Sequence, residues 1–261
     1  MPPAHLARAA YRCLWAGGNG VTGEVVDGSM KVDIWSDVVC PFCYVGKRRL
    51  EKALESFAHR DEVEVVWHSF QLDPGAPAIA EGRTVERLAA KYGMTLEQAI
   101  AAQESLAANA ATVGLDFNWQ ETKAGNTFDA HRLIHFAAAQ GHGDAMKERL
   151  LRAFFTEGEQ VGDRDVLVRL AAEVGVDEAL ARDVLDSGRH GEDVQADLAQ
   201  AQAYGIRGVP FFVIDEKYGI SGAQPTPVFT QALEQAWSEA HPLAMVTGDG
   251  GGACEGDNCA V

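Results

Sequence analysis

Two cysteines at C-x-x-C spacing carry the clearest chemical signal in this chain, in the run Cys40-Pro41-Phe42-Cys43. Residues 31–35 before it alternate in polarity and predict a short strand, and apolar residues recur at helical spacing over 44–57. Proline is tolerated in a first helical turn because an N–H there has no partner within the helix. Cys40 is therefore expected at a helix N-terminus, where the helix dipole lowers the pKa of a thiol and makes it a nucleophile. Cys43 could attack back and release a bound partner, and we expect its pKa not to be lowered.

A zinc site is the main alternative for such a pair. Four-coordinate zinc needs a second ligand pair, and Cys13, Cys254 and Cys259 are distant in the chain. His131 and His135 have a ligand-like spacing, but they fall on a predicted helix far away in sequence. We therefore expect redox chemistry without a metal, and we expect His131 to be a packed core residue rather than a catalytic one.

A second signal lies at Val209-Pro210, which leads directly into the apolar strand 211–214. Proline can open a strand because it removes no needed ladder donor there. An X-Pro bond adopts the cis form at modest cost, so this bond is a candidate for it. An ordinary trans proline at the start of a strand is the alternative.

Three runs of the chain resemble the DsbA-like branch of the thioredoxin superfamily, and within it the FrnE-type proteins. They are the C-P-F-C run within 35–46, the run N-T-F-D-A-H-R-L at 126–133, and the G-V-P-F-F run within 205–212. The likeness covers roughly residues 30–241. The first and third runs are specific to the fold, and the second points to this branch.

The resemblance implies that Pro210 is cis and lies opposite Cys40, and that Val209 offers its backbone N–H and C=O to an extended substrate as an added strand. The family often buries an acid beneath the reactive pair. Asp37 and Asp33 are the nearby candidates, because strand alternation places them on one face. For Asp33 a solvated surface position is favoured over a buried one. For Asp37 the buried and the solvated positions are equally open.

The residues between the cysteines tune the redox potential. A cation there would stabilise a thiolate and make the disulfide strongly oxidising, but Pro41-Phe42 is neutral. We therefore expect a more reducing potential, compatible with isomerase or reductase work. Phe42 could form an apolar collar around the dithiol with Trp35, Tyr44 and Phe211, or these four could be plain core.

The elements around these motifs predict an α/β fold. A second strand over 62–70 completes a parallel strand–helix–strand unit, and a hairpin of 211–214 with 218–221 follows much later. Between them the pattern is helical, with a Thr95/Gln98 capping box that opens a helix to Val113. Further helices are predicted over 128–139, 144–156, 164–174, 177–185 and 192–204. A closing helix runs from Thr226 as N-cap, with Pro227 at its first position, to about Ala240.

The fold class is thus a thioredoxin-like βαβ–ββα sheet domain with a large inserted all-helical domain. The predicted boundaries divide the chain into a flexible N-terminal tail 1–29, a first half-domain 30–75, a helical insertion 76–204, a second half-domain 205–241 and a flexible C-terminal tail 242–261. Met30 could be the true start.

Composition limits the partners. A formal net charge of −16 argues against nucleic acid, which is bound by clustered Lys and Arg. No window approaches the roughly 20 apolar residues of a membrane span, and the start lacks a signal-peptide core, so we expect a cytoplasmic protein. In a reducing cytosol, five cysteines favour catalysis or metal binding over structural disulfides. We expect a monomer without cofactor.

Cys254 and Cys259 near the glycine-rich end are the least determined feature. They could form a second redox pair that exchanges with Cys40 and Cys43, form half of a metal site with Glu255 and Asp257, or have no role. About 20 extended residues span roughly 65 Å, so the tail could reach Cys40.

The leading function is that of a protein disulfide oxidoreductase or isomerase. Its expected partners are thiol- or disulfide-bearing proteins, with glutathione or a thioredoxin-type protein as donor. The alternative is a glutathione-linked kappa-type transferase or a 2-hydroxychromene-2-carboxylate isomerase-like enzyme. The resemblance to those enzymes implies a single serine or cysteine, whereas this chain has both Cys40 and Cys43. A non-enzymatic partner that retains the fold is a third possibility.

Overall fold

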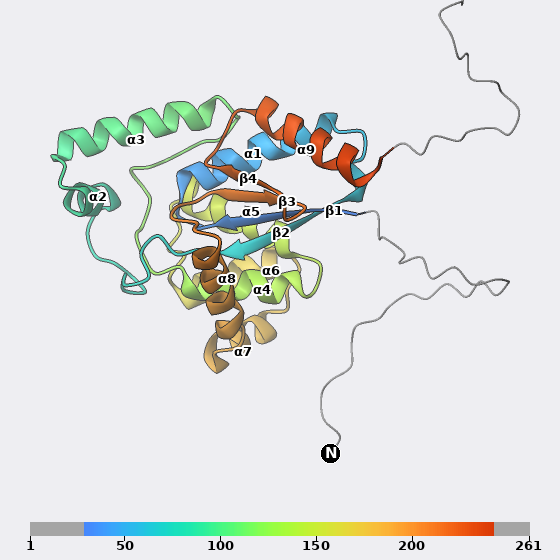
Figure 1. Ribbon diagram of the computed structural model, residues 1–261. Helices are drawn as coiled ribbons and strands as arrows, with labels where there is room; N and C mark the ends of the chain where they lie inside the picture. The colour runs from blue at the N-terminus through green and yellow to red at the C-terminus, as the bar shows by residue number, and fades with distance from the viewer. Residues whose placement is uncertain (1–28, 243–261) are drawn as a thin grey trace, which may run out of the picture.

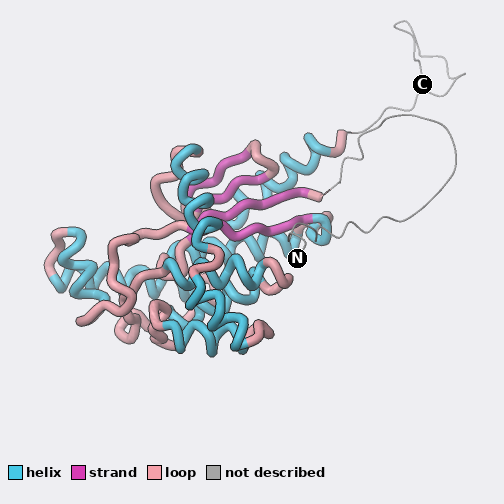
Figure 2. The backbone as a smooth tube through the Cα atoms, turned by 90° about the horizontal axis from the view of Figure 1, so that it is seen from below, coloured by secondary structure: helices cyan, strands magenta, loops and turns pink. Residues whose placement is uncertain are grey.

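The computed structural model describes residues 29–242, and its centre is a four-stranded sheet with the strand order β2-β1-β3-β4 (Figure 1). β1 (Met30–Ser36) pairs in parallel with β2 (Val63–Ser69) and antiparallel with β3 (Phe211–Ile214). β3 forms an antiparallel hairpin with β4 (Tyr218–Ser221). Figure 2 shows the four strands side by side as one sheet. The predicted strand–helix–strand unit and hairpin are confirmed, and β1 joins them because it pairs with a strand of each.

Two helices cover one face of the sheet. α1 (Pro41–Ser56) follows β1 and leads through the short 3-10 helix η1 (Arg60–Glu62) into β2. α9 (Thr226–Ala240) packs against α1 and against the β3–β4 hairpin (Figure 1). Their apolar faces enter a common core, in which Leu50 of α1 and Leu233 of α9 are both buried.

Seven helices lie between β2 and β3 in the chain. They are α2 (Thr84–Tyr92), α3 (Leu96–Ala111), α4 (Phe128–Ala138), α5 (Gly143–Phe155), α6 (Arg164–Glu173), α7 (Glu178–Ser187) and α8 (Gly191–Ala203). α5 and α8 pack against β2, whereas α2 and α3 extend to one side (Figure 1). A thioredoxin-like sheet with a helical insertion is therefore confirmed. None of the helices within residues 29–242 is long and apolar enough to cross a membrane.

Three details differ from the sequence-based expectations. β1 does not alternate between buried and exposed residues, because it is a central strand between layers of helices, and only Lys31 of its seven residues is not buried. The helix α2 was not predicted, since its nine residues bury only Val85 and Ala89 and give a weak periodic signal. Pro225, not Thr226, is the N-cap of α9. The capping box of Thr95 at the start of α3 is confirmed.

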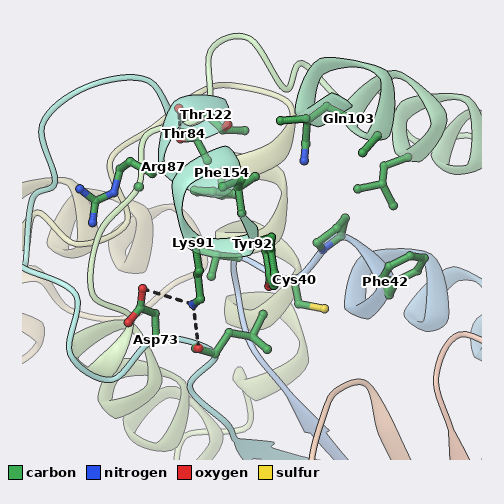
Figure 3. Close-up of a pocket in the computed structure, with 18 of the residues that line it drawn as sticks. Cys40, Phe42, Asp73, Thr84, Arg87, Lys91, Tyr92, Gln103, Thr122 and Phe154 are labelled. Carbon is green, nitrogen blue, oxygen red and sulfur yellow. Dashed lines mark hydrogen bonds and ion pairs between the residues drawn. The ribbon is translucent and has the colours of Figure 1, made fainter. Parts of the chain in front are cut away.

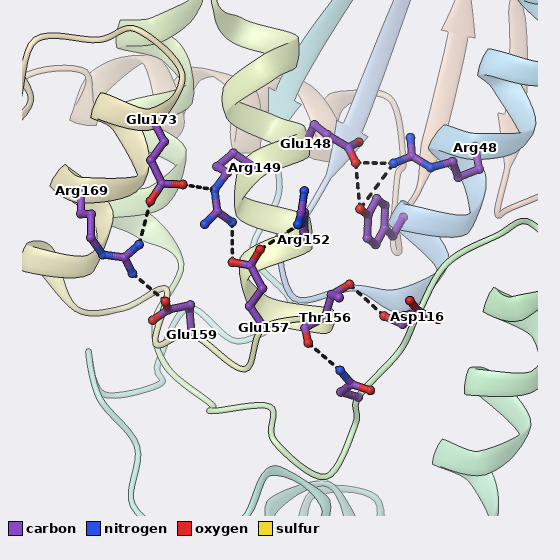
Figure 4. Close-up of polar contacts among 12 residues, drawn as sticks. Arg48, Asp116, Glu148, Arg149, Arg152, Thr156, Glu157, Glu159, Arg169 and Glu173 are labelled. Carbon is purple, nitrogen blue, oxygen red and sulfur yellow. Dashed lines mark hydrogen bonds and ion pairs between the residues drawn. The ribbon is translucent and has the colours of Figure 1, made fainter.

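Charged side chains fix α5 between α1 and α6 (Figure 4). On the α1 side, the Tyr44 hydroxyl donates to Glu148 over 2.8 Å, and Arg48 pairs with the same carboxylate. On the α6 side, Arg149 pairs with Glu173 at 2.7 Å. α5 is thus held from both sides, which matters because it carries a buried lysine next to the cysteine pair.

Candidate active site

The cysteine pair lies where β1 gives way to α1. Cys40 is the N-cap of α1 with an extended backbone, and Pro41 occupies the first helical turn, both as predicted. The backbone N–H of Cys40 donates to Asp37 O at 3.3 Å, and that of Cys43 donates to Cys40 O at 3.0 Å. Both cysteines are free thiols, and they are 3% and 1% exposed. A local turn therefore holds the two sulfurs close together in a largely buried position.

The loop before β3 faces this pair. The Val209-Pro210 bond is cis, as predicted, and the Cys40 thiol donates to Val209 O at 3.4 Å. Gly46 lets α1 approach this loop, because a Cβ there would lie 3.1 Å from both Pro210 and Phe212. Two signals about 170 residues apart in the chain thus meet at one place.

Asp37 is the buried acid near the dithiol. It is fully buried in the turn after β1, where it accepts from the Leu72 N–H at 2.8 Å and lies 3.3 Å from His131 Nε2. Burial opposes its ionisation, but these hydrogen bonds and the charge of Lys147 outweigh it and lower the pKa of Asp37. Burial lowers the pKa of His131, so this ring is neutral and orients the acid. His131 is a packed core residue, as the sequence favoured.

Asp33 does not share this role. Both interpretations made from the sequence are wrong for it, because it is neither beneath the dithiol nor solvated. β1 ends at Ser36, so strand alternation does not extend to Asp37. Asp33 is instead buried against β2, where it bonds His68 Nε2 at 2.6 Å and pairs with Lys31 at 2.8 Å.

Lys147 of α5 is a component of the site that sequence reasoning missed. It is 1% exposed, and its Nζ donates to Ser36 O at 3.3 Å and lies 5.4 Å from the Trp67 ring. Burial lowers the pKa of Lys147 to about 8, although the cysteines and Asp37 act in the opposite direction. No spacing in the sequence distinguishes this lysine from the surface lysines of other amphipathic helices.

The pKa values of the two thiols shift in the directions opposite to those that the sequence predicted. The hydrogen bond with Cys43, together with burial, raises the pKa of Cys40. Burial opposes ionisation of Cys43 as well, but the hydrogen bond from Cys40 and the charge of Lys147 outweigh it and lower the pKa of Cys43. The prediction of a lowered Cys40 pKa is therefore wrong, because the helix terminus is not the dominant influence on a buried, hydrogen-bonded pair.

A cavity of about 820 Å³ opens beside Cys40, which lines it while Cys43 does not (Figure 3). α2 and α3 supply much of its wall, and the end of α5 supplies Phe154 and Phe155. Lys91 at the rim pairs with Asp73 at 3.3 Å and donates to Leu72 O at 3.2 Å. Access from this cavity favours Cys40 over Cys43 as the sulfur that meets a substrate.

The proposed apolar collar is only partly present. Phe42 lines the cavity and is exposed, but Trp35, Tyr44 and Phe211 do not line it. Trp35 stacks on His68, and Phe211 packs beside Trp35 in a small apolar cluster separate from the main core. Cys13, Cys254 and Cys259 lie outside the described residues.

Known proteins resemble this chain over most of its length. The crystal structure of a probable DsbA oxidoreductase from Streptomyces coelicolor shares 46% identity with it, with a TM-score of 0.78, covering 89% of this chain and 99% of that one. The uncharacterized protein YwbO of Bacillus subtilis is 32% identical over 209 residues, covering 78% of this chain and 96% of its own.

A more distant structure shares the fold alone. The cytosolic disulfide reductase DsbM from Pseudomonas aeruginosa is 18% identical, with a TM-score of 0.56, and the match covers 78% of this chain and 97% of that chain.

Residues 31–234, which include the cysteine pair and the Val209-Pro210 loop, match the family described as DSBA-like thioredoxin domain. The chain therefore belongs to the DsbA-like thioredoxin domain family.

Proposed function

We propose that this protein is a thiol–disulfide oxidoreductase that works through Cys40 and Cys43. The observation that carries the proposal is the paired thiols at the start of α1, with one of them on a cavity wall and within 3.4 Å of Val209 O. Membership of the DsbA-like family supports it. The FrnE-type subgroup, isomerase activity and a cytoplasmic location remain part of this proposal.

The proposed reaction is two-electron thiol–disulfide exchange. In the reducing direction, Cys40 passes its proton to the Cys43 thiolate, attacks a substrate disulfide, forms a mixed disulfide and expels one substrate thiolate, which takes up that proton. Cys43 then attacks Cys40 Sγ, closes the Cys40–Cys43 disulfide and expels the second substrate thiolate. An external thiol donor, glutathione or a thioredoxin-type protein, reduces the enzyme again. In the oxidising direction the same steps run backwards, and the substrate becomes the disulfide.

Several neighbours would support these steps. Val209 would pair its backbone with an extended peptide, which gives broad specificity because backbone pairing does not read side chains. Pro41 and exposed Phe42 would contact the substrate at the mouth of the cavity. Asp37 would lie beneath the cysteine pair, where its negative charge raises the pKa of Cys40.

A turnover assay with insulin as the model disulfide and a thiol donor tests the proposal. Wild type should reduce insulin, and Cys40→Ser should not. Cys43→Ser should accumulate a mixed disulfide, because it can attack but has no second thiol for release. Wild-type turnover that survives in Cys40→Ser would disprove the assignment.

The cavity favours one second candidate, a small-molecule enzyme related to the kappa-type transferases and 2-hydroxychromene-2-carboxylate isomerases. Its volume of about 820 Å³ and its largely apolar lining are typical of a site for a small ligand. Such an enzyme would need only one of the two thiols. Cys43→Ser would then keep full activity on an aromatic substrate with glutathione present, whereas the oxidoreductase would lose turnover.

A further inference from the structure

Lys147 is buried, and no counter-ion within residues 29–242 is in contact with it. Its one hydrogen bond within residues 29–242 is the bond to Ser36 O, and no carboxylate oxygen of those residues lies within 4.0 Å of Nζ. Burying an ammonium group in this way costs several kcal/mol unless nearby negative charge compensates. The fold therefore keeps a lysine where methionine would be less costly.

Lys47 shows what a compensated lysine looks like in the same region. It is also buried and lies 6.0 Å from the same Trp67 ring. Its Nζ pairs with Glu51, Asp144 and Glu148, the latter two at 3.3 and 3.1 Å. Three carboxylates thus neutralise Lys47, whereas Lys147 has none in contact among the residues that the structure describes.

The titratable groups that face Lys147 are those of the dithiol site. Cys40 and Cys43 come from the start of α1 and Asp37 from the turn before it, and all three favour the charged lysine. The charge of Lys47 on α1 disfavours the charged form of Lys147, and the charge of Lys147 in turn disfavours protonation of His131 on α4. The Asp37 carboxylate already accepts from Leu72 and lies beside His131. The remaining negative charge available to Lys147 is a thiolate of the cysteine pair.

Ser36 adds a second polar group on the same side. Its hydroxyl is buried and makes no hydrogen bond of normal geometry within residues 29–242, yet it lies near enough to Cys43 to help lower the pKa of that thiol. Ser36 also supplies the carbonyl that holds Lys147. A hydroxyl and an ammonium group thus stand beside the inner sulfur, each with unused donors.

We propose that Lys147 is a positioning residue that stabilises the thiolate of the reduced Cys40/Cys43 pair and thereby raises its reduction potential. The inference rests on the proposed oxidoreductase function. The charge that the neutral Pro41-Phe42 dipeptide lacks would come from beneath the dithiol, from the inserted helix α5. The pair is then more oxidising than its dipeptide predicts, because the cation favours the reduced form of the enzyme.

The effect is measured as an equilibrium with the glutathione couple. The reaction is reduced enzyme, with one thiol and one thiolate, plus one glutathione disulfide and one proton from solvent, giving oxidised enzyme plus two glutathione thiols, so two electrons and two protons balance. Lys147→Met removes the charge at similar volume, so at pH 7 the equilibrium constant should rise about tenfold, equivalent to a potential lower by about 30 mV. Lys147→Arg keeps the charge and should stay within about threefold of wild type. Lys52→Met, an exposed lysine of the same helix α1 as Cys43, removes equal net charge and should change nothing.

The pH profile separates charge from packing. The pKa of Lys147 is lowered to about 8 by burial, so the difference between wild type and Lys147→Met should narrow above that pH. The arginine variant stays charged and should show no such narrowing. Thermal unfolding should show Lys147→Met to be as stable as wild type or more so. If that variant does not fold, Lys147→Gln serves, since its amide can still donate to Ser36 O.

An equilibrium constant unchanged in folded Lys147→Met, or an arginine variant that matches the methionine variant, overturns the inference and leaves the oxidoreductase function intact. A wild-type pair that forms no disulfide at any ratio of glutathione disulfide to thiol overturns both. The two failures are therefore distinct.

Discussion

At the scale of single residues, the dithiol shows how burial and hydrogen bonding decide which sulfur holds a charge. A helix N-terminus stabilises an anion by up to about 2 kcal/mol in favourable geometry. Cys40 has that position, but it is buried and, in the charged state of the pair, donates its one proton to the Cys43 sulfur. Cys43 accepts the hydrogen bond from Cys40, and the charge of Lys147 also stabilises its thiolate. The inner sulfur therefore ionises first.

We predict that Cys43 titrates below, and Cys40 above, the ordinary thiol pKa in the reduced wild-type protein. The physical reason is the shared proton, which stays on Cys40 while the charge lies on Cys43. NMR of protein with ¹³C-labelled cysteine measures this directly, because each Cβ shift reports its own thiol. Cys40 titrating first would contradict the prediction and restore the dominance of the helix terminus.

His68 of β2 is a partly buried ionisable residue that does not line the cavity. Its Nε2 bonds Asp33 at 2.6 Å and its Nδ1 bonds Asp197 at 2.7 Å, while its ring stacks on Trp35. Burial opposes its protonation, but the two carboxylates outweigh it and raise the pKa of His68. The same contacts, against the effect of burial, lower the pKa of Asp33 and of Asp197. A charged imidazole thus joins the sheet to α8.

The pH dependence of stability follows from these directions. The raised pKa of His68 contributes stability that is complete below its unfolded value of about 6.5 and is lost as pH rises through the folded value. The lowered carboxyl pKa values of Asp33 and Asp197 contribute stability that is complete above about 4 and is lost in acid. We expect the full contribution of this cluster between about pH 4 and 6.5.

His68→Phe keeps the ring that stacks on Trp35 and removes both hydrogen bonds. It should lower the free energy of unfolding by about 3 kcal/mol at pH 6, and by less at pH 9. Urea denaturation at both pH values gives the two differences. His59→Phe is the control, because His59 also stacks on a tryptophan but its side chain is 39% exposed, against 13% for His68, and it should change stability by less than about 0.5 kcal/mol. Equal losses at both pH values would show that the His68 charge is unimportant.

At the scale of elements, the first residue of the run 126–133 connects two segments that are distant in the chain. Asn126 donates from its side chain to Pro74 O and Ala76 O at 3.1 and 2.9 Å, and its Oδ1 accepts from Gln71 and from the Phe128 N–H. One amide thus fixes the loop after β2 to the start of α4. That loop supplies Ala76 to the cavity wall.

Two later positions of this run serve other elements. His131 bonds the acid near the dithiol, and buried Arg132 donates to the carbonyls of Val184, Leu185 and Arg189 at the end of α7. The run therefore connects the site to the helical insertion, which the sequence could register only as a family likeness.

Asn126→Asp should lower the free energy of unfolding by about 2–4 kcal/mol, because a carboxylate oxygen would face two carbonyl oxygens where an amide donated. Thermal or urea unfolding measures the loss. Asn109→Asp provides a matched control, since Asn109 uses its Oδ1 to accept from Arg49 at 3.1 Å and aspartate keeps that acceptor. The prediction fails if the two substitutions have the same effect.

At the scale of the whole molecule, the sheet separates the dithiol from the end of α9. β1 runs from the edge where α9 ends to the opposite edge, where α1 begins (Figure 1). A segment that starts after Pro242 must therefore travel about the length of α1, roughly 24 Å, to reach Cys40. The twelve residues from Pro242 to Cys254 would reach about 40 Å if fully extended, which exceeds that distance.

The domain boundaries at 75/76 and 204/205 stay a proposal, and the second cysteine pair lies beyond them in the chain.

We predict that Cys254 and Cys259, outside the described residues, form a disulfide that exchanges with Cys40/Cys43. Tethering raises the effective concentration to the millimolar range, so even a weak encounter is frequent. The double variant Cys254→Ser/Cys259→Ser should keep single-turnover exchange and lose multiple-turnover rate. Identical rates in both assays would leave the tail pair without this role, and zinc analysis of the purified protein would then test the metal alternative.

The sequence alone determined the parts of this protein that depend on local pattern. Sequence periodicity indicated β1, β2, the hairpin and most helices, because polar and apolar residues recur at the period of the element that carries them. Two short motifs identified the thioredoxin-like fold, Cys40, Cys43 and the Val209-Pro210 loop. The nine-residue α2 was missed because so few of its residues are buried.

Only the tertiary structure decided which charged residues surround the dithiol. Lys147 and Asp37 are about 110 positions apart in the chain, and both occupy ordinary places in their own segments. Asp33 is buried although the sequence favoured a solvated position for it, because its partner His68 comes from the neighbouring strand. The pKa of each sulfur depends on such contacts, since burial and charge act over a few ångströms of space whatever the separation in sequence.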